Sequence, residues 1–305
     1  MRTFEDNDYY GHSLIAARYC GFKVPPKSID GLWVHGWIDP LMPDVTAANG
    51  VKDEDKKSLK LFVWNRRELA KARAAGFEKV TAIGSPFVYL TEPDFAERTR
   101  NLLVMPTHTI PTIEARYKTD DMIDYLNQIR SCFNSVTVCL YYADYPSLAP
   151  IFARAGYKVV CAGDVKDSKF LYKLYVFLRQ SEFFLSNNVM TGVWYALYAG
   201  CKVFLQPINV MEIGQDGLKD NWYKVNPIVV DPTIKIHRGE SLRAFFPHLI
   251  RDHTNPIKDV NLGARELGYA FKRRPEELKL LFGWNKSALF LSKVLSIIQG
   301  DKQRC

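Results

Sequence analysis

The sequence has no long hydrophobic run. Hydrophobic residues make up 47% of its 305 residues, yet no window approaches the roughly 20 consecutive apolar residues of a membrane-spanning helix. The opening residues, MRTFEDNDYYGH, also lack the basic start and apolar stretch of a secretory signal. We therefore expect a cytoplasmic globular protein, and its length favours two lobes over one hydrophobic core.

Paired cysteines are absent as well. The six cysteines are scattered without a C-x-x-C pair, and four lie inside apolar runs where a reduced thiol packs as a small hydrophobe. They are Cys20, Cys132, Cys139, Cys161, Cys201 and Cys305. We interpret them as reduced thiols in the core of a protein that resides in a reducing compartment.

Acidic residues are fewer than basic ones, and the formal net charge is +8. This balance favours a polyanionic partner, such as nucleotide phosphates, nucleic acid or an anionic membrane surface. In the last case the protein would bind peripherally to the inner membrane. A nucleic-acid partner is not expected, because no strand face interleaves aromatic and basic residues. The basic residues of 66–79 and 272–274 form either a face toward anionic lipid or ordinary solvated surface.

What the sequence does have is an alternation of short apolar runs and amphipathic stretches, which is typical of βαβ units around a parallel sheet. In its first third, a helix is expected over 65–77, with Asn65 as its N-cap and Gly76 as its stop. Buried strands are expected at 31–36, 59–64 and 79–84. Two prolines within 85–101 then break the alternation.

The alternation restarts at residue 102 and continues to residue 207, which predicts a second, doubly wound lobe. Strands are expected at 102–106, 135–142, 158–163, 182–187 and 201–207, and helices at 120–133, 145–157, 167–180 and 190–200. Two amphipathic helices, at 274–283 and 287–300, need an apolar surface and are expected to cross back to the first lobe. The predicted fold is α/β with two Rossmann-like lobes and parallel sheets, divided as 1–97, 98–270 and 271–305.

The segment LSNNVMTGVWYALYAGCKVF, residues 185–204, indicates a ligand site. A strand ends in Ser186, Asn187 and Asn188, and a helix starts beside Thr191 and Gly192. Ligands of doubly wound sheets bind at the carboxyl ends of strands, and a helix start there suits a phosphate. The alternative is that these polar residues only cap the helix.

This segment resembles the donor site of GT-B glycosyltransferases, in particular those of bacterial capsule and lipopolysaccharide assembly, including sialic acid and Kdo transferases. The matching residues are Ser186, Asn187, Thr191, Gly192, Tyr195, Ala196, Leu197, Gly200, Lys202 and Val203. A second resemblance is NLLVMPTHTI, residues 101–110, where Pro106-Thr107-His108 stands in place of the adjacent His-Pro pair of that clan.

The resemblance implies transfer of a sugar from a nucleotide-sugar donor, held in the 98–270 lobe, to a glycan or lipid-linked acceptor on the 1–97 lobe. It also implies no cofactor. No Asp-x-Asp pair lies in a plausible metal-binding loop, because Asp120 and Asp121 are expected to open a helix, so no catalytic metal is expected either. A phage-type enzyme acting on DNA, or a nucleotide-sugar epimerase or binding protein on the same lobes, remain alternatives.

The resemblance and the strand ends together select the candidate residues. His108, helped by Thr107 and Thr109, is expected at the departing phosphate. His35 with Asp39 is expected on the acceptor side as base and orienting group, or else His35 is buried between tryptophans. A third group of candidates, Glu5, Asp6, Asp8 and His12, precedes a helix. Its members are either catalytic or simply charged partners of the helix dipole.

The nucleoside is expected over the strand end CAGD, residues 161–164. Gly163 would let a base approach the backbone, and Asp164 would bind a ribose hydroxyl or a base amine. Tyr141 is expected to line the same crevice or to pack at the edge of the sheet.

Overall fold

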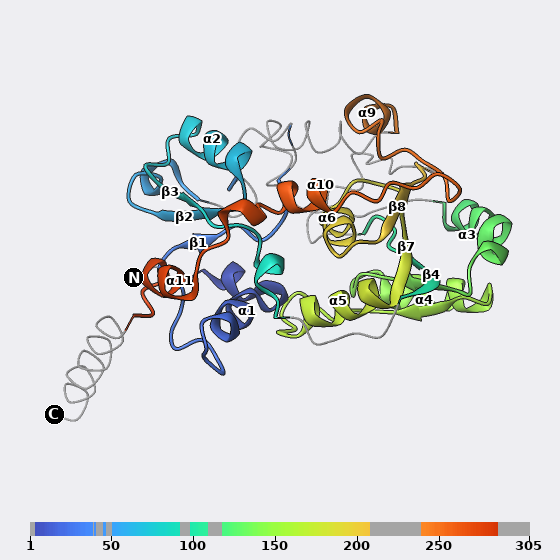
Figure 1. The fold of residues 1–305 in the computed structure, drawn as a ribbon, viewed down its shortest axis with the longest axis horizontal. Coiled ribbons are helices and arrows are strands. Elements are labelled where there is room, and N and C mark those ends of the chain that lie inside the picture. Colours follow the sequence, from blue (N-terminus) through green and yellow to red (C-terminus); the bar gives the residue numbers. More distant parts are fainter. Residues whose placement is uncertain are drawn as a thin grey trace.

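The computed structural model describes residues 4–38, 40, 45–46, 51–91, 98–108, 118–207 and 239–285. They form two α/β lobes, each built on its own parallel sheet (Figure 1). The smaller lobe carries β1–β3, α1 (His12–Tyr19), α2 and α11, and the larger lobe carries β4–β8 and α3–α6; the bounds of the other elements follow below. The predicted fold class, two Rossmann-like lobes with parallel sheets, is confirmed.

The smaller lobe has a three-stranded sheet in the order β1-β2-β3. Its strands are β1 (Leu32–Trp33), β2 (Lys60–Val63) and β3 (Lys79–Ala82). The helix between the last two is α2 (Arg66–Ala74), and the side chain of Asn65 accepts the backbone N–H of Glu68 at its start. The predicted N-cap is therefore confirmed, and Gly76, with φ of +94°, follows the end of the helix as expected.

The larger lobe has a five-stranded sheet in the order β6-β5-β4-β7-β8. The chain builds outward from β4 in one direction and then returns to build from β4 in the other, so the switch point lies between β4 and β7. The strands are β4 (Thr99–Val104), β5 (Ser135–Cys139), β6 (Lys158–Val160), β7 (Ser181–Ser186) and β8 (Lys202–Leu205). The helices are α3 (Thr119–Ile129), α4 (Tyr145–Arg154), α5 (Phe170–Gln180) and α6 (Thr191–Tyr198).

Alternate residues of these strands face opposite layers, as the two-residue period of a strand requires. Leu102 and Val104 of β4 belong to a core cluster with side chains of α3 and α4. Leu103, between them, belongs to a second cluster with α5 and α6. The second cluster continues into the smaller lobe, where Phe87 stacks on Tyr195 of α6 with ring centroids 4.1 Å apart. The two lobes therefore share an apolar core.

The C-terminal part of the chain returns to the smaller lobe. Helix α9 (Gly239–Phe245) and α10 (Val260–Glu266) belong to the larger lobe's side, and α10 lies against α6. The chain then crosses between the lobes at Leu267, whose carbonyl accepts the N–H of Ser85 at 2.8 Å. Helix α11 (Pro275–Leu281) packs on the smaller lobe, with Phe282 beside Trp33. The predicted return is confirmed for this helix, whereas residues 287–300 lie outside the described residues.

Several expected strands are shorter in the structure. The run 31–36 contributes only the two residues of β1, because the chain leaves the sheet after Val34, whose N–H still bonds to Phe62 of β2, and meets the other lobe at Trp37. The five cysteines within the described residues are free, and Cys20, Cys139 and Cys201 are buried, as expected of core thiols.

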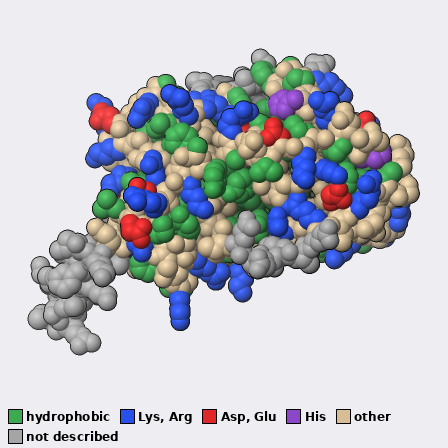
Figure 2. Space-filling model, in the orientation of Figure 1, with side chains coloured by type: hydrophobic (Ala, Val, Ile, Leu, Met, Phe, Trp, Pro, Cys, Tyr) green, Lys and Arg blue, Asp and Glu red, His purple; other side chains and the backbone are tan. Residues whose placement is uncertain are grey.

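Lysine and arginine side chains spread over the visible face of the molecule instead of gathering in one patch (Figure 2). Several of those named above have intramolecular partners: Arg67 pairs with Glu266, Lys71 donates to the carbonyl of Pro40, and Arg273 donates to that of Ala82. Within the described residues, no helix is both long enough and apolar enough to span a membrane.

Candidate functional site

The carboxyl ends of strands from both sheets surround one cavity of about 220 Å³. The smaller lobe lines it with Tyr10, His35 and Gly36. The larger lobe lines it with the ends of β4, β5 and β6 and with the start of α6. Its lining residues from that lobe include Met105, Pro106, His108, Cys139, Tyr141, Ala162, Thr191, Gly192 and Tyr195. We call this space the interlobe cavity.

His35 lies at the cavity's smaller-lobe side, just beyond β1. Its Nδ1 is 3.7 Å from the Oδ2 of Asp6, and the two side chains are 29% and 22% exposed. The ring of Tyr9 meets the imidazole edge-on at 5.4 Å. Burial lowers the pKa of His35, and the carboxylate of Asp6 opposes that shift. The residue is therefore a neutral imidazole near neutral pH with a carboxylate placed to stabilise its protonated form.

His12, expected in the same cluster, is fully buried at the start of α1 (His12–Tyr19). Its ring lies 6.0 Å from those of Tyr10 and Trp33, and neither ring nitrogen has a hydrogen-bond partner among the described residues. Burial, followed by the nearby charge of His35, lowers the pKa of His12 well below its usual value. The side chain is neutral and does not line the interlobe cavity.

The acidic residues of the cluster differ in position. Asp6 faces His35, whereas Glu5 is 80% exposed and pairs with Lys166 of the larger lobe at 3.6 Å. Asp8 is exposed and accepts the hydroxyl of Ser13. Only Asp6 is therefore adjacent to a group that lines the cavity. Asp39 and Thr109 lie outside the described residues.

His108 lines the interlobe cavity four residues beyond the end of β4. Its ring lies against that of Tyr141, with centroids 4.3 Å apart and planes inclined by 31°. The hydroxyl of Tyr141 in turn lies 3.3 Å from that of Tyr10, so a phenol from each lobe meets at the cavity. Burial raises the pKa of both phenols, which keeps them protonated.

Thr107, the residue before His108, helps to hold the switch point of the sheet together. The backbone N–H and the hydroxyl of Thr107 both donate to Oδ1 of Asn187, at 2.7 and 2.9 Å. This amide therefore joins the carboxyl ends of β4 and β7. Asn187 and Ser186 are fully buried, and Asn188, which is 1% exposed, accepts the N–H of Val189. Ser186 and Asn188 accept backbone N–H groups of the turn, and the Nδ2 of Asn187 is a buried donor without a partner among the described residues. None of the three side chains lines the interlobe cavity.

The start of α6 does line the interlobe cavity, through Thr191 and Gly192. The Oγ1 of Thr191 accepts the backbone N–H of Trp37 at 3.1 Å. Because this bond joins the two lobes, the helix start that the sequence marks as a phosphate site lies directly beside the smaller lobe.

The strand end over which the nucleoside is expected contributes Ala162 to the cavity wall. Gly163 has φ of +121°, and the carboxylate of Asp167 lies where a side chain at Gly163 would start. Asp164 is exposed and accepts the N–H of Lys166 at 2.7 Å, so it orders its own turn.

Sequence reasoning missed two residues of the N-terminal segment. Tyr10 adopts a left-handed φ of +56°, which is costly for a residue with a side chain, and its N–H donates to the carbonyl of Val165 at 2.7 Å. Asn7 is buried and bonds through its amide to Gly31 and Trp33. Tyr10 therefore joins the two lobes, whereas Asn7 holds the N-terminal segment to the smaller lobe. The adjacent aromatic residues of NDYYGH were the local signal for this segment.

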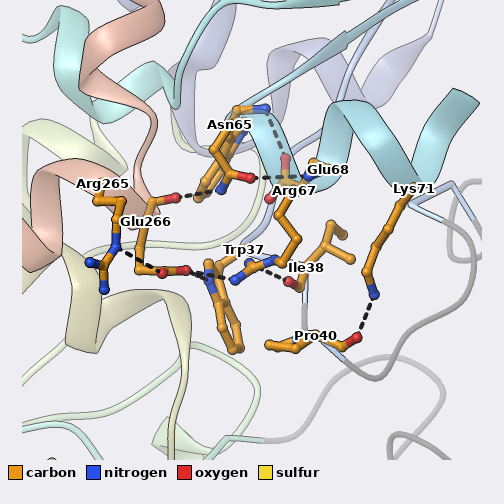
Figure 3. Close-up of polar contacts among 10 residues, drawn as sticks. Trp37, Ile38, Pro40, Asn65, Arg67, Glu68, Lys71, Arg265 and Glu266 are labelled. Carbon is orange, nitrogen blue, oxygen red and sulfur yellow. Dashed lines mark hydrogen bonds and ion pairs between the residues drawn. The ribbon is translucent and has the colours of Figure 1, made fainter.

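Sequence reasoning also missed a polar cluster on the other side of Trp37. The indole Nε1 of Trp37 and the Nη1 of Arg67 both donate to Oε2 of Glu266 at 2.9 Å (Figure 3). Arg67 also donates to the carbonyl of Ile38, and Asn65 donates to the backbone of Glu266. The cluster ties α2 to α10 and so fixes the angle between the lobes on this side.

No group of three or more His, Cys, Asp or Glu side chains in the described parts of the chain is arranged to hold a metal ion. The absence of a catalytic metal stays a prediction. The fold and the site thus define the class: a two-lobed α/β protein with a cavity between the carboxyl ends of two parallel sheets.

No protein-family model matches the chain, and no curated protein matches it. The solved structures that are similar to the chain include two that cover 80% of it. One is a mutant of S. aureus TarM in complex with fondaparinux, alpha-GlcNAc-glycerol and UDP, at 14% identity and a TM-score of 0.33. The other is TarM, at 13% identity and a TM-score of 0.31. The chain spans 45% and 44% of those proteins. Similarity of this extent carries no argument about the site or its ligands.

Proposed function

We propose that the protein is a metal-independent glycosyltransferase of the GT-B type, which moves a sugar from a nucleotide-sugar donor to a glycan or lipid-linked acceptor. The observation that carries the proposal is that His35 and His108, each just beyond the first strand of its own lobe's sheet, line one cavity. A polysaccharide of the bacterial capsule or lipopolysaccharide is the proposed product, and the cytoplasm is the proposed location.

The larger lobe is the proposed donor side. The start of α6 presents backbone N–H groups and the positive end of the helix dipole to the cavity, where a diphosphate would be stabilised. The hydroxyl of Thr191 has its oxygen occupied by Trp37 and keeps its proton for donation. When the bond between the sugar's anomeric carbon and the phosphate oxygen breaks, the electron pair stays on that oxygen. His108 donates a hydrogen bond or a proton to it.

The smaller lobe is the proposed acceptor side. Neutral His35 takes the proton of the acceptor hydroxyl as its oxygen forms the new bond to the anomeric carbon, and the carboxylate of Asp6 stabilises the imidazolium. Tyr10 and Tyr141, both protonated, donate hydrogen bonds toward sugar oxygens. Asp6 is also the carboxylate that would serve a double displacement with retention, so the stereochemical course follows from which group contacts the anomeric carbon.

Donor binding is the first test. In thermal-shift measurements with CMP, UDP, GDP and TDP, a ligand at 100 times its dissociation constant stabilises the fold by about 2.7 kcal/mol. One of the four is expected to raise the melting temperature, and its sugar conjugate then serves in transfer assays. If none of the nucleotides or their sugar conjugates binds, the proposal is wrong.

Histidine variants are the second test. His108→Ala should slow both sugar transfer and donor hydrolysis, and His35→Ala should slow transfer while sparing nucleotide affinity. The expected loss is about 10²–10⁴ in rate. His253→Ala is the matched control, because this histidine lies beside Cys132 and Phe133, away from the interlobe cavity. Near-normal turnover in both cavity variants would overturn these roles.

A further inference from the structure

A second cleft lies outside the interlobe cavity, in the corner between α2, α10 and the short helix Tyr269–Phe271. Its volume is about 510 Å³, within the range of about 300–1,000 Å³ typical of small-molecule sites. Three arginines, Arg66, Arg67 and Arg265, line it together with one acidic residue, Glu266. We call it the arginine cleft.

The wall of the arginine cleft carries uncompensated positive charge. The carboxylate of Glu266 is already engaged, because Oε2 accepts hydrogen bonds from both Arg67 and Trp37 (Figure 3). Arg66 is exposed and makes no hydrogen bond or ion pair with the described residues. Arg265 is 74% exposed, and its Nε is 3.9 Å from the other oxygen of Glu266. Two guanidinium groups are thus available to an anion, and the Nε of Arg67 is a buried donor without a partner in the described part of the chain.

The floor of the arginine cleft is apolar. Tyr269 is 50% exposed and Phe271 lies beside it, so the arginine cleft presents an aromatic surface. The ammonium of Lys272 lies 5.9 Å from the centroid of the Tyr269 ring and adds to the positive field. Guanidinium groups bind carboxylate and phosphate in a bidentate manner, while an exposed aromatic face packs against the C–H face of a sugar ring.

We propose that the arginine cleft binds a saccharide that bears a carboxylate or phosphate group, and that this saccharide is part of the acceptor. The first statement rests on the geometry of the cleft, and the second rests on the proposed function. Trp37 lies between the two sites, since its indole bonds to Glu266 of the arginine cleft and its N–H bonds to Thr191 of the interlobe cavity. If the arginine cleft holds an acidic sugar unit between α2 and α10, a neighbouring unit of the same glycan would lie toward His35.

Calorimetric titration of the full chain without nucleotide tests the binding. Trigalacturonate supplies the carboxylate, glucose 6-phosphate supplies the phosphate, and maltotriose is the neutral control. At least one acidic probe should bind, with affinity that falls as salt is raised. Arg66→Ala and Arg265→Ala should each weaken it about tenfold, the loss of one charged hydrogen-bonding partner. Tyr269→Ala should also weaken binding of the acidic probe. Melting curves check that each variant folds.

Arg154→Ala is the matched control, an exposed arginine of α4 in the larger lobe, and it should leave affinity unchanged. The proposal is overturned if no acidic probe binds at millimolar concentration, if maltotriose binds as well as the acidic probes, or if the cleft variants behave like Arg154→Ala. Because the measurement contains no nucleotide, its result is independent of donor binding. If the chain binds an acidic saccharide but no nucleotide, the proposed binding role of the arginine cleft stands and the proposed transferase function is wrong.

Discussion

The backbone N–H of Trp37 donates to the side-chain oxygen of Thr191 at 3.1 Å, and this bond joins the smaller lobe to the start of α6 in the larger one. This bond limits the hydrogen bonds that the Thr191 hydroxyl can make to a ligand. The hydroxyl oxygen is used between the lobes, and its proton remains to be donated. A residue of the proposed phosphate site is therefore also part of the contact that sets the distance between the lobes.

Thr191→Val should test both roles. Valine has the shape of threonine without the acceptor, so the N–H of Trp37 loses its partner and the free energy of unfolding should fall by about 1–2 kcal/mol. Affinity for the nucleotide should fall too, while Thr191→Ser restores both properties. Thr191→Glu should abolish nucleotide binding, because a carboxylate at the helix start repels phosphate. Unchanged affinity in both the Val and Glu variants would leave this residue only its structural bond.

Asn187→Ala should destabilise the larger lobe strongly. The substitution leaves the N–H and the hydroxyl of Thr107 buried without an acceptor, and each unsatisfied group costs about 1–3 kcal/mol. We expect a loss of about 2–4 kcal/mol in urea unfolding. Asn134→Ala, at an exposed asparagine, should change stability by less than about 0.5 kcal/mol. Equal behaviour of the two variants would contradict a structural role for the Asn187 amide.

Gly268→Ala should prevent the chain from crossing between the lobes. Gly268 has φ of +69°, and an added Cβ would lie 1.8 Å from the carbonyl oxygen of Trp64. Backbone must move at both segments, so we expect a loss above about 4 kcal/mol or no soluble protein. Gly156→Ala is the control for backbone strain alone, since φ is +84° with nothing within 4 Å. It should cost about 1–2 kcal/mol. Similar melting temperatures for the two variants would show that the close approach is not limiting.

The sequence predicted the alternation of strands and helices because burial of apolar runs and helix caps are local signals. Asn65 could be recognised as a cap from its position before an amphipathic stretch, and the structure confirms it. His35 and His108 could be selected because each follows an apolar run, and their common cavity follows from the parallel arrangement of both sheets. Their catalytic roles stay predictions.

Contacts between distant segments had no such signal. The pairing of Arg67 with Glu266 joins residues from opposite ends of the chain, and each looks like an ordinary charged residue of a helix. The bonds from Thr107 to Asn187 could not be foreseen, because the two residues become neighbours only when β7 inserts beside β4; the predicted donation from Asn187 to phosphate stays a prediction. The left-handed backbone of Tyr10 is likewise imposed by the larger lobe, through Val165 and Phe170.

Glu68 gives the protein a stability that depends on pH. The side chain is fully buried, and burial raises its pKa to about 7, although the N–H of Trp64 and the charge of Arg67 lower it. Its ordinary value is 4.5. Between these values the folded protein binds more protons at this group than the unfolded chain does. The free energy of unfolding must therefore fall as pH rises from about 4.5 to 7 and stay low above it.

Glu68→Gln should remove this dependence. Glutamine keeps an oxygen to accept the N–H of Trp64 and carries no charge to bury. A pKa raised by about 2.5 corresponds to about 3 kcal/mol, so the variant should gain up to about 3 kcal/mol over the wild type at pH 8, about 1 kcal/mol at pH 5 and almost nothing at pH 4. Urea unfolding of both proteins across this range measures the difference, in which other titrating groups, such as buried His12, cancel. A stability difference that is independent of pH would mean that Glu68 titrates alike in the folded and unfolded chains. A variant less stable than the wild type at pH 8 would mean that Arg67 and Trp64 stabilise the ionised form of Glu68 by more than burial costs.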